Sequence, residues 1–283
     1  MILILNAGGN IGTELVRELA SRSADFTSGY RKAEDVTAAQ SEGRKAVIAD
    51  YARPETLQRA FEGVNKAFFV TPPTANLEEL ERNVVDAAKS AGVEQLVKLS
   101  VWGADKGEFI FGRPHQAVER YIEASGVPYT FLRPTGFMQN MLANAGTIKA
   151  EGKFYLPAGD ARVAEIDYRD IARVAAVALT QPGHVGKAYE LSGPAAMTHT
   201  ERAAVLSEVL GRPFTYVSPP EADWKQMMLG YGLPEPQIDG IIDLIHYYRS
   251  GKSERVSPAV REVTGEEPID YRQFVTDYAS AFD

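Results

Sequence analysis

Short β-type runs alternate with helical stretches through the first two thirds of this 283-residue chain. Such alternation is typical of a parallel sheet with helices on both of its faces. The expected strands lie at residues 2–5, 24–30, 45–50, 66–71, 95–100 and 129–133. The expected helices lie at residues 11–22, 54–62, 76–91 and 114–125, several of them ending at a glycine. The pattern predicts an α/β fold built on a doubly wound parallel sheet.

The rhythm changes after Pro134. We expect a helix over 138–149, then a strand, a turn and a helix over 163–179, and one more sheet strand at 189–193. From Met197 onward the pattern is mainly helical and is interrupted by prolines. These features predict two domains, a core of residues 1–150 to which 163–193 return, and a smaller, mostly helical C-terminal cap formed mainly by 151–162 and 194–283.

The composition excludes several classes of protein. A net charge of -8 and a pI near 5.2 disfavour a nucleic-acid-binding surface. The absence of cysteine excludes disulfides, thiol catalysis and thiolate metal sites. No apolar run approaches the ~20 residues needed to cross a bilayer, and the apolar start of the chain lacks the basic segment of a signal peptide. We expect a cytoplasmic monomer or homodimer with no membrane or nucleic-acid partner.

A glycine-rich stretch, N-A-G-G-N-I-G at residues 6–12, joins the first expected strand to the first expected helix. At such a junction, free backbone N–H groups and the helix dipole converge on one point and bind anions. Gly9 would let a pyrophosphate approach the backbone, and Gly12 would let the helix pack close to the sheet. Asn6 stands where a dinucleotide-binding loop has its first glycine, but asparagine tolerates a positive φ better than most residues. The candidate dinucleotide contacts are Gly8, Gly9, Asn10, Ile11 and Gly12; a glycine-rich turn without a ligand is the alternative.

The residues after the second expected strand indicate which nucleotide would bind. A site specific for NAD places an acidic residue about 20 residues beyond the glycine loop, whereas the 2′-phosphate of NADP requires cations there. Here Arg31 and Lys32 follow the strand, and the planar guanidinium of Arg31 suits phosphate oxygens. NADP(H) is therefore the predicted cofactor. Because Glu34 and Asp35 follow at once, a solvated charged turn is the alternative.

Polar residues and prolines follow the third and fourth expected strands, at the sheet edge where ligands of such folds bind. Asp50, with Tyr51 beside it, could accept a hydrogen bond from an adenine amino group. Equally, Asp50 could be the N-cap of the helix that follows. Thr71, Pro72 and Pro73 would form a rigid wall beside the nicotinamide ribose.

Taken together, these stretches resemble the NmrA-like atypical short-chain dehydrogenase/reductases. The resemblance rests on the loop at 6–12 as a variant of GATGxxG, on Arg31, on VTPP, and on the stretches GVPYTFLRPTGFMQN and IDYRDIARVA. It covers most of the chain, and within the family it is most similar to NADPH-dependent quinone oxidoreductases and triphenylmethane-dye reductases. It implies a Rossmann core that binds NADP(H), a cleft between core and cap, and either a reductase or a redox-sensing regulator. The departures from the pattern are Asn6 for glycine and Gly8 for threonine.

The residues that supply the proton in ordinary members of the wider superfamily are absent. Those enzymes use a Tyr-x-x-x-Lys pair with a serine after the fifth strand, and Ser100 matches that serine as a candidate cofactor contact. Phe111 and His115 occupy the Tyr and Lys positions, and phenylalanine has no acidic proton. His115, near the start of a helix, is the remaining catalytic candidate, kept neutral by the positive end of the helix dipole. Alternatively, His115 and Glu119 are polar flanks of a packed helix.

The segment after the sixth expected strand would cross above the nicotinamide in the resembled family. Phe137, Met138 and Asn140 are therefore candidates to line the pocket of a flat acceptor, with Gln139 as a further hydrogen-bonding group. Alternatively, Phe137 and Met141 form the apolar stripe of an ordinary helix. In the cap, core packing is favoured over a pocket wall for Trp224, Met227, Met228 and Tyr231. Four scattered histidines give no reason to expect a metal.

The missing proton donor also bears on the substrate. Reducing a ketone builds alkoxide charge that needs a positioned acid, whereas a quinone or a cationic dye accepts hydride into a delocalised product. The leading hypothesis is an NADPH-dependent oxidoreductase that transfers hydride to a quinone or similar conjugated, electron-poor acceptor without a Tyr–Lys pair. The alternative is a non-catalytic NADP(H) sensor of the NmrA type that acts through a protein partner.

Overall fold

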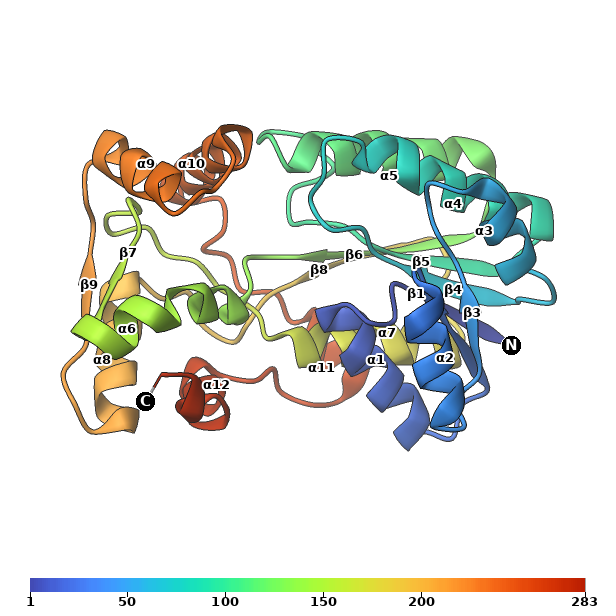
Figure 1. Ribbon diagram of the computed structural model, residues 1–283, viewed down its shortest axis with the longest axis horizontal. Coiled ribbons are helices and arrows are strands. Elements are labelled where there is room, and N and C mark those ends of the chain that lie inside the picture. Colours follow the sequence, from blue (N-terminus) through green and yellow to red (C-terminus); the bar gives the residue numbers. More distant parts are fainter. Residues whose placement is uncertain (283) are drawn as a thin grey trace.

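The computed structural model describes residues 1–282, and its centre is a seven-stranded parallel sheet (Figure 1). The strands are β1 (Ile2–Leu5), β2 (Phe26–Tyr30), β3 (Ala46–Ile48), β4 (Lys66–Phe69), β5 (Gln95–Leu99), β6 (Tyr129–Pro134) and β8 (Lys187–Leu191). Their order across the sheet is β3-β2-β1-β4-β5-β6-β8, and every neighbouring pair is parallel. The predicted doubly wound parallel sheet is confirmed.

Helices cover both faces of this sheet (Figure 1). One face packs against α1 (Asn10–Ser21), α2 (Ala33–Ser41), α7 (Tyr168–Thr180) and α11 (Ala259–Thr264). The other packs against α3 (Pro54–Ala60), α4 (Leu77–Ala91) and α5 (Gly112–Ser125). Within β1, Ile4 belongs to the first core, whereas Leu3 and Leu5 belong to the second, because successive strand residues point to opposite faces. Both cores are apolar, which is why the strands read as short hydrophobic runs.

The helix α2 was not expected from the sequence. It buries a single residue, Ala39, so its sequence carries no apolar stripe at helical spacing. The four expected helices of the core are present with ends that differ by up to two residues. Gly92 and Gly126 end α4 and α5 in the left-handed conformation, as helix stops do.

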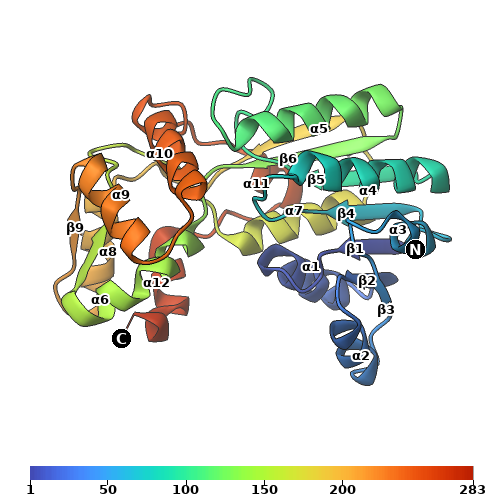
Figure 2. The ribbon, with the colours of Figure 1, turned by 45° about the horizontal axis from the view of Figure 1, so that its top comes forward.

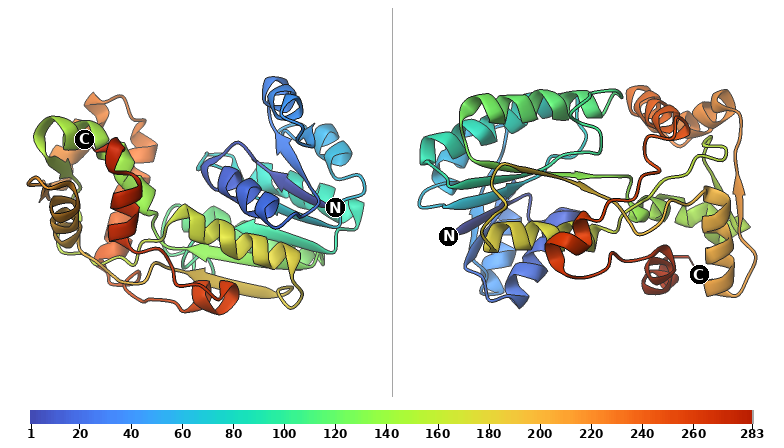
Figure 3. Two further views of the ribbon diagram at one scale, coloured as in Figure 1. Left: turned by 90° about the horizontal axis from the view of Figure 1, so that it is seen from below. Right: turned by 180° about the vertical axis from the view of Figure 1, so that it is seen from behind.

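The remaining elements form a second region at one end of the sheet (Figure 3). It contains η1 (Met138–Asn144), α6 (Ala145–Glu151), β7 (Lys153–Tyr155), α8 (His199–Leu210), β9 (Thr215–Val217), α9 (Glu221–Gly230), α10 (Glu235–Arg249), α12 (Tyr271–Asp277) and η2 (Ala279–Ala281). β7 and β9 pair as a small parallel sheet. The helix expected over 138–149 is a 3-10 helix followed by an α-helix. Over 163–179 we expected a strand, a turn and a helix. In place of the strand the structure has an extended segment with two isolated bridges, Phe137–Ile166 and Val163–Met197.

Two features join this second region to the sheet. The loop after β5 packs against α10, with the rings of Phe109 and Tyr247 4.7 Å apart and the indole N–H of Trp102 donating to the carbonyl of Lys252 at 3.0 Å. Beyond α10 the chain returns, so that α11 packs on α7 with Val260 in the core of the sheet region. Figure 2 shows α11 close to α7, while α9 and α10 lie on the left, with the rest of the second region. The division into core and cap made from the sequence stays a proposal. Within residues 1–282, none of the helices combines the length and apolar character needed to cross a bilayer.

Candidate active site

The candidate site residues come from loops at one edge of the sheet. Because all seven strands are parallel, the segments after β1, β2, β3, β4, β5 and β6 all leave at the carboxyl edge. The strand order reverses between β1 and β4, and ligands of such sheets bind at that switch point. The glycine loop follows β1 and the residues Thr71 to Pro73 follow β4, so both lie at the switch point.

The glycine loop is built around Asn6. Asn6 has a φ of 56°, so the expected tolerance of asparagine for this left-handed conformation is confirmed. A Cβ added to Gly12 would lie 2.2 Å from the Asn6 carbonyl oxygen, and one added to Gly9 would lie 2.9 Å from the Asn6 side-chain nitrogen. The loop therefore needs glycine at position 12, where backbone atoms would block a Cβ, whereas at position 9 the Asn6 side chain would have to move. Asn6 supplies the turn that the first glycine makes in other loops.

Backbone donors at the start of α1 have no acceptors within residues 1–282. Gly9 is the N-cap and makes no side-chain cap hydrogen bond, and Thr13 is the first residue whose N–H bonds back to it, at 2.8 Å. The N–H groups of Asn10, Ile11 and Gly12 make no hydrogen bond to the described residues. Orphan donors at a helix N-terminus suit an anion such as a pyrophosphate. These residues fit the predicted dinucleotide, and their contact with it stays a prediction.

The two cations after β2 differ in their surroundings. Lys32 pairs with Glu34 at 2.9 Å on the surface, which fits the alternative of a solvated charged turn for this residue. Arg31 is exposed and makes no ion pair within residues 1–282. Tyr30, which precedes it, lies against Gly8, with ring carbons 3.5 Å from where a Gly8 Cβ would be. Arg31 therefore remains available for a phosphate, close to the glycine loop.

Asp50 does not cap the helix that follows. The N-cap of α3 is Arg53, and it makes no side-chain cap hydrogen bond. The Asp50 carboxylate instead accepts from the Ala52 N–H at 3.1 Å and from Arg53 Nε at 2.9 Å. The N-cap alternative is thus wrong, because the carboxylate closes the turn between β3 and α3. An adenine contact would have to share a carboxylate already engaged by this turn.

The residues that follow β3 and β4 are partly enclosed. The Tyr51 hydroxyl donates to the Val70 carbonyl at 3.2 Å, and burial raises the pKa of this phenol well above its ordinary value. Thr71 is buried, whereas Pro72 and Pro73 are exposed. The prolines therefore face solvent, as residues that contact a ligand would.

Lys98, Glu81 and His115 form a buried cluster beside this edge. Lys98 and Glu81 are ion-paired with fully buried side chains, and Lys98 Nζ lies 3.1 Å from His115 Nδ1. Burial, reinforced by the Lys98 charge, holds the pKa of His115 well below its ordinary value, so the imidazole is neutral. The direction of this pKa shift agrees with the expected neutral imidazole, and burial is its largest cause.

A second buried chain of polar groups runs beside the first. The Ser100 hydroxyl donates to Glu119 at 2.6 Å, and Arg133 on β6 donates to both Glu119 carboxylate oxygens, at 3.0 and 2.6 Å. Glu119 and His115 are both buried, so neither is a solvated residue of α5, and a functional role for His115 stays a prediction. Because the Ser100 hydroxyl donates its proton to Glu119, the Ser100 oxygen could only accept a hydrogen bond from a cofactor.

The segment after β6 only partly matches its expected role. Phe137 is half-buried and its ring meets that of Tyr168 edge-on at 5.0 Å, while Asn140 is exposed. Met138 is buried in the core of the second region, as is Met141. Gln139 is also buried and accepts from the Tyr168 N–H at 3.2 Å. In this structure Phe137 and Asn140 are thus the accessible members of the expected lining, and Met138 packs in the core.

Other residues picked from the sequence lie apart from this edge. Of the four aromatic and methionine residues on and after α9, Trp224 is buried and donates to the Tyr155 carbonyl at 3.1 Å. Tyr231 is 64% exposed, so core packing holds for Trp224 and is wrong for Tyr231. Met227 and Met228 are half-buried. Within residues 1–282, no group of three or more His, Asp or Glu side chains is placed to hold a metal ion.

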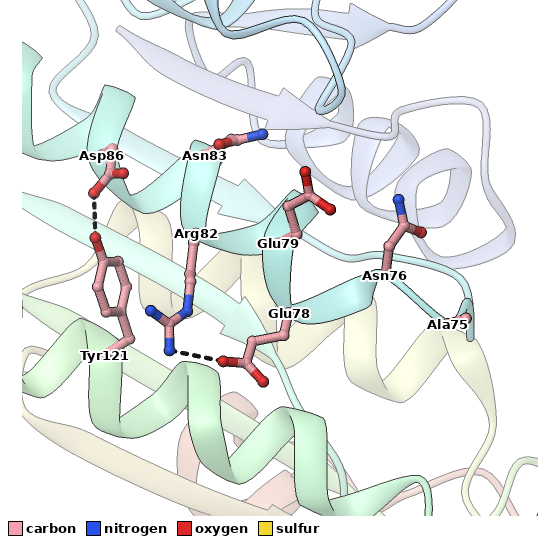
Figure 4. Close-up of a pocket in the computed structure, with 8 residues that line it drawn as sticks. All are labelled: Ala75, Asn76, Glu78, Glu79, Arg82, Asn83, Asp86 and Tyr121. Atoms are coloured by element: carbon pink, nitrogen blue, oxygen red, sulfur yellow. Dashed lines mark hydrogen bonds and ion pairs between the residues drawn. The ribbon is translucent and has the colours of Figure 1, made fainter.

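A largely polar groove on the outer surface is not the site described above (Figure 4). It lies on α4 and reaches Tyr121 of α5, whose hydroxyl donates to Asp86 at 2.7 Å. Arg82 is tied to Glu78 within it, also at 2.7 Å. The groove carries more acidic than basic groups, which does not suit a dinucleotide phosphate.

Sequence reasoning missed Lys98, Glu81 and Arg133. Two of them carried a signal. Lys98 interrupts an apolar strand, and Glu81 stands in the apolar stripe of its helix, between Leu77 and Val84. A charged residue at a core position needs a buried partner, so these two could have been paired in advance.

Comparisons with known proteins agree with this geometry. Residues 7–182 match the NAD(P)H-binding family. The chain is 36% identical to an NAD(P)H azoreductase of Xenophilus azovorans over all of this chain and 99% of the relative. Its fold superimposes with a TM-score of 0.91 on an NADPH-dependent quinone oxidoreductase of Escherichia coli complexed with NADPH, at 29% identity over 99% and 100% of the two chains.

A second similar structure is the triphenylmethane reductase of Citrobacter sp. complexed with NADP(H). It gives a TM-score of 0.88 at 26% identity, covering 98% of this chain and 99% of that one. The family match begins within the glycine loop and ends just after α7, and it includes the residues after β2 and after β4. The chain belongs to the NAD(P)H-binding family.

Proposed function

We propose that this protein is an NADPH-dependent oxidoreductase that reduces a quinone or a similar conjugated, electron-poor acceptor. The observation that carries the proposal is the glycine loop at the switch point of the parallel sheet, where the N–H groups of Asn10, Ile11 and Gly12 have no acceptor within residues 1–282. The sequence has Phe111 where the resembled superfamily has its tyrosine. It is supported by relatives named as azo, quinone and triphenylmethane reductases.

The glycine loop and Arg31 would hold the cofactor. The N–H groups of Asn10, Ile11 and Gly12 would bind the pyrophosphate, and Arg31 the 2′-phosphate. NADPH, when bound, supplies the hydride. Ser100 and Thr71 at the ends of neighbouring strands would orient the nicotinamide end, and Phe137 would lie against a flat acceptor.

Phe111 cannot supply a proton, and its ring instead packs on Gly240 of α10, where an added Cβ would lie 2.5 Å from the ring. An acceptor whose reduced form is delocalised needs less help from an acid than a ketone does. His115, on the next turn of α5, is the titratable group we assign as the catalytic candidate.

The direct test is an assay of NADPH oxidation, in which the near-ultraviolet absorbance of the reduced nicotinamide is monitored. The acceptors tested are quinones, azo and triphenylmethane dyes, and aliphatic ketones. We expect turnover with the conjugated acceptors and little with the ketones. Ketones as the best substrates would contradict the proposed acceptor class. Tight NADPH binding with no turnover of any acceptor would favour the sensor instead.

Replacing Arg31 with glutamate tests the cofactor preference. We expect Arg31→Glu to weaken NADPH binding about a hundredfold, because a charge-assisted phosphate contact is lost and a repulsive one is added. NADH, which has no 2′-phosphate, should bind almost as before. The measurement is the dissociation constant of each cofactor by calorimetry.

Arg261→Glu is the matched control, since Arg261 is an exposed arginine on α11 and its replacement changes the net charge equally. It should leave both dissociation constants unchanged. Equal weakening of NADPH and NADH by Arg31→Glu would mean that the 2′-phosphate lies elsewhere.

A further inference from the structure

Lys98 has a placement that hydride transfer alone does not explain. Its fully buried ammonium on β5 lies between the Glu81 carboxylate and His115 Nδ1. An ammonium has hydrogen-bond donors only, so Nδ1 must accept and the proton of the neutral imidazole must be on Nε2. Nε2 has no hydrogen-bond partner within residues 1–282 and is not among their enclosed unpaired atoms. The donor side of the ring is thus free for a ligand.

We propose that Lys98 is a positioning residue that makes His115 a proton donor to the reduced acceptor. It fixes the tautomer with hydrogen on Nε2, and it passes a proton to Nδ1 as Nε2 gives its own away. This inference rests on the proposed function, because the proton is needed only if hydride reaches an acceptor.

The reason lies in the acidity of imidazole. A neutral imidazole is a very weak acid, since loss of its proton leaves an imidazolate anion. His115 cannot avoid this by being protonated in advance, because burial and Lys98 lower its pKa. A second proton delivered to Nδ1 removes the obstacle, since the ring then stays neutral throughout.

The step balances as follows. The Nε2–H bond breaks as a new bond forms to the anionic oxygen or nitrogen of the reduced acceptor. At the same time an Nζ–H bond of Lys98 breaks and an Nδ1–H bond forms. His115 ends as the other neutral tautomer and Lys98 as an amine beside the Glu81 carboxylate. Water then returns a proton to Nε2, and Nδ1 returns its own to Lys98.

The neighbouring charges fit this role. Glu81 on α4 binds Lys98 and so holds the ammonium in place. Glu119 follows His115 by one helical turn, but its carboxylate is taken by Arg133 and Ser100. It is therefore not free to accept a proton from the ring. Lys98 is the one described residue that makes a hydrogen bond to the His115 imidazole.

The first test is spectroscopic and needs no cofactor. In protein with isotope-labelled histidine nitrogens, the His115 signals are those lost in His115→Gln. We expect a single neutral tautomer with hydrogen on Nε2. The double variant Glu81→Leu/Lys98→Met removes both charged partners, so no unpaired charge remains buried. In this variant we expect a mixture of tautomers. Hydrogen on Nδ1 in the native protein, or an unchanged tautomer in the double variant, would overturn the proposal.

The second test is kinetic. His115→Gln and the double variant should each lower kcat for a quinone, by about a hundredfold for His115→Gln, as loss of a general acid does, with KM for NADPH little changed. Gln95→Met is the control, because Gln95 is a buried polar residue at the other end of β5, bonded to Thr130. It should keep native kcat.

The two proposals fail in different ways. If the native protein reduces quinones and His115→Gln matches it, the proton relay is wrong while the oxidoreductase stands. If no acceptor is reduced by the native protein, the proposed function fails and the relay fails with it, even where the spectrum shows the expected tautomer.

Discussion

Gly12→Ala is expected to weaken NADPH binding strongly and to destabilise the fold. The added Cβ would lie 2.2 Å from the Asn6 carbonyl oxygen and 3.0 Å from the Ala7 Cα, and neither backbone atom can turn aside as a side chain could. Relief requires α1 to move away from β1, which we expect to cost about 1–3 kcal/mol of unfolding free energy. The same movement displaces the orphan N–H groups, so NADPH affinity should fall by at least about a hundredfold.

Thermal unfolding and calorimetric titration with NADPH measure the two effects. Gly8→Ala is the matched control for stability, because its Cβ would be in ordinary contact with Tyr30 at 3.5 Å. Gly146→Ala, with open space around the new Cβ, controls for binding as well. If Gly12→Ala kept native stability and affinity, the close approach of the loop to the helix would not matter.

Glu81→Leu is expected to cost about 3–5 kcal/mol of unfolding free energy. Burial already raises the pKa of the Glu81 carboxyl, with Lys98 opposing that rise, so the pair exists in a dry environment where a lone charge is costly. Leucine leaves the buried Lys98 without its counter-ion, and neutral His115 cannot replace it. Urea denaturation of the native and variant proteins measures the loss.

The double variant Glu81→Leu/Lys98→Met should recover most of this loss, since an apolar pair of similar volume is often as stable as a buried ion pair. The expected signature is therefore strong coupling between two single changes that are each harmful. Additive losses would mean that the two side chains stabilise the fold independently. A stable double variant that still lacks activity would separate the role of the pair in folding from its role beside His115.

The sheet could be predicted because each strand and most helices of the core carry a local signal. Four of the seven expected strands end too late, as 66–71 does against Lys66–Phe69, because residues that follow a strand can be apolar or buried without pairing. The helix α2 could not be predicted, since it is held by few apolar contacts and reads as a charged turn. The extended segment 163–166 is buried by its neighbours rather than by a sheet.

The parts of the site that depend on backbone geometry, such as the glycine loop, could be predicted. The contact between the Lys98 and His115 side chains could not. Asn6, Gly9 and Gly12 follow from the demands of one turn, and their local structure is as expected. The sequence allowed two roles for Asp50, an adenine contact and the N-cap of the following helix. The structure excludes the N-cap, because the carboxylate accepts from the Ala52 N–H in a local turn that the sequence pattern does not indicate. Lys98 meets His115 only because β5 and α5 pack together, which no linear pattern records.

The return of the chain to the sheet through α11 has a consequence for how such proteins can diversify. The elements of the second region alternate along the chain with elements of the sheet region, and Val260 of α11 lies in the core of the sheet region. The second region therefore cannot be exchanged as one contiguous segment. A recombination breakpoint after β8 would carry α11 away with α9 and α10, and would strip apolar cover from α7. Variation in this architecture should therefore arise by point substitution rather than by exchange of the whole second region.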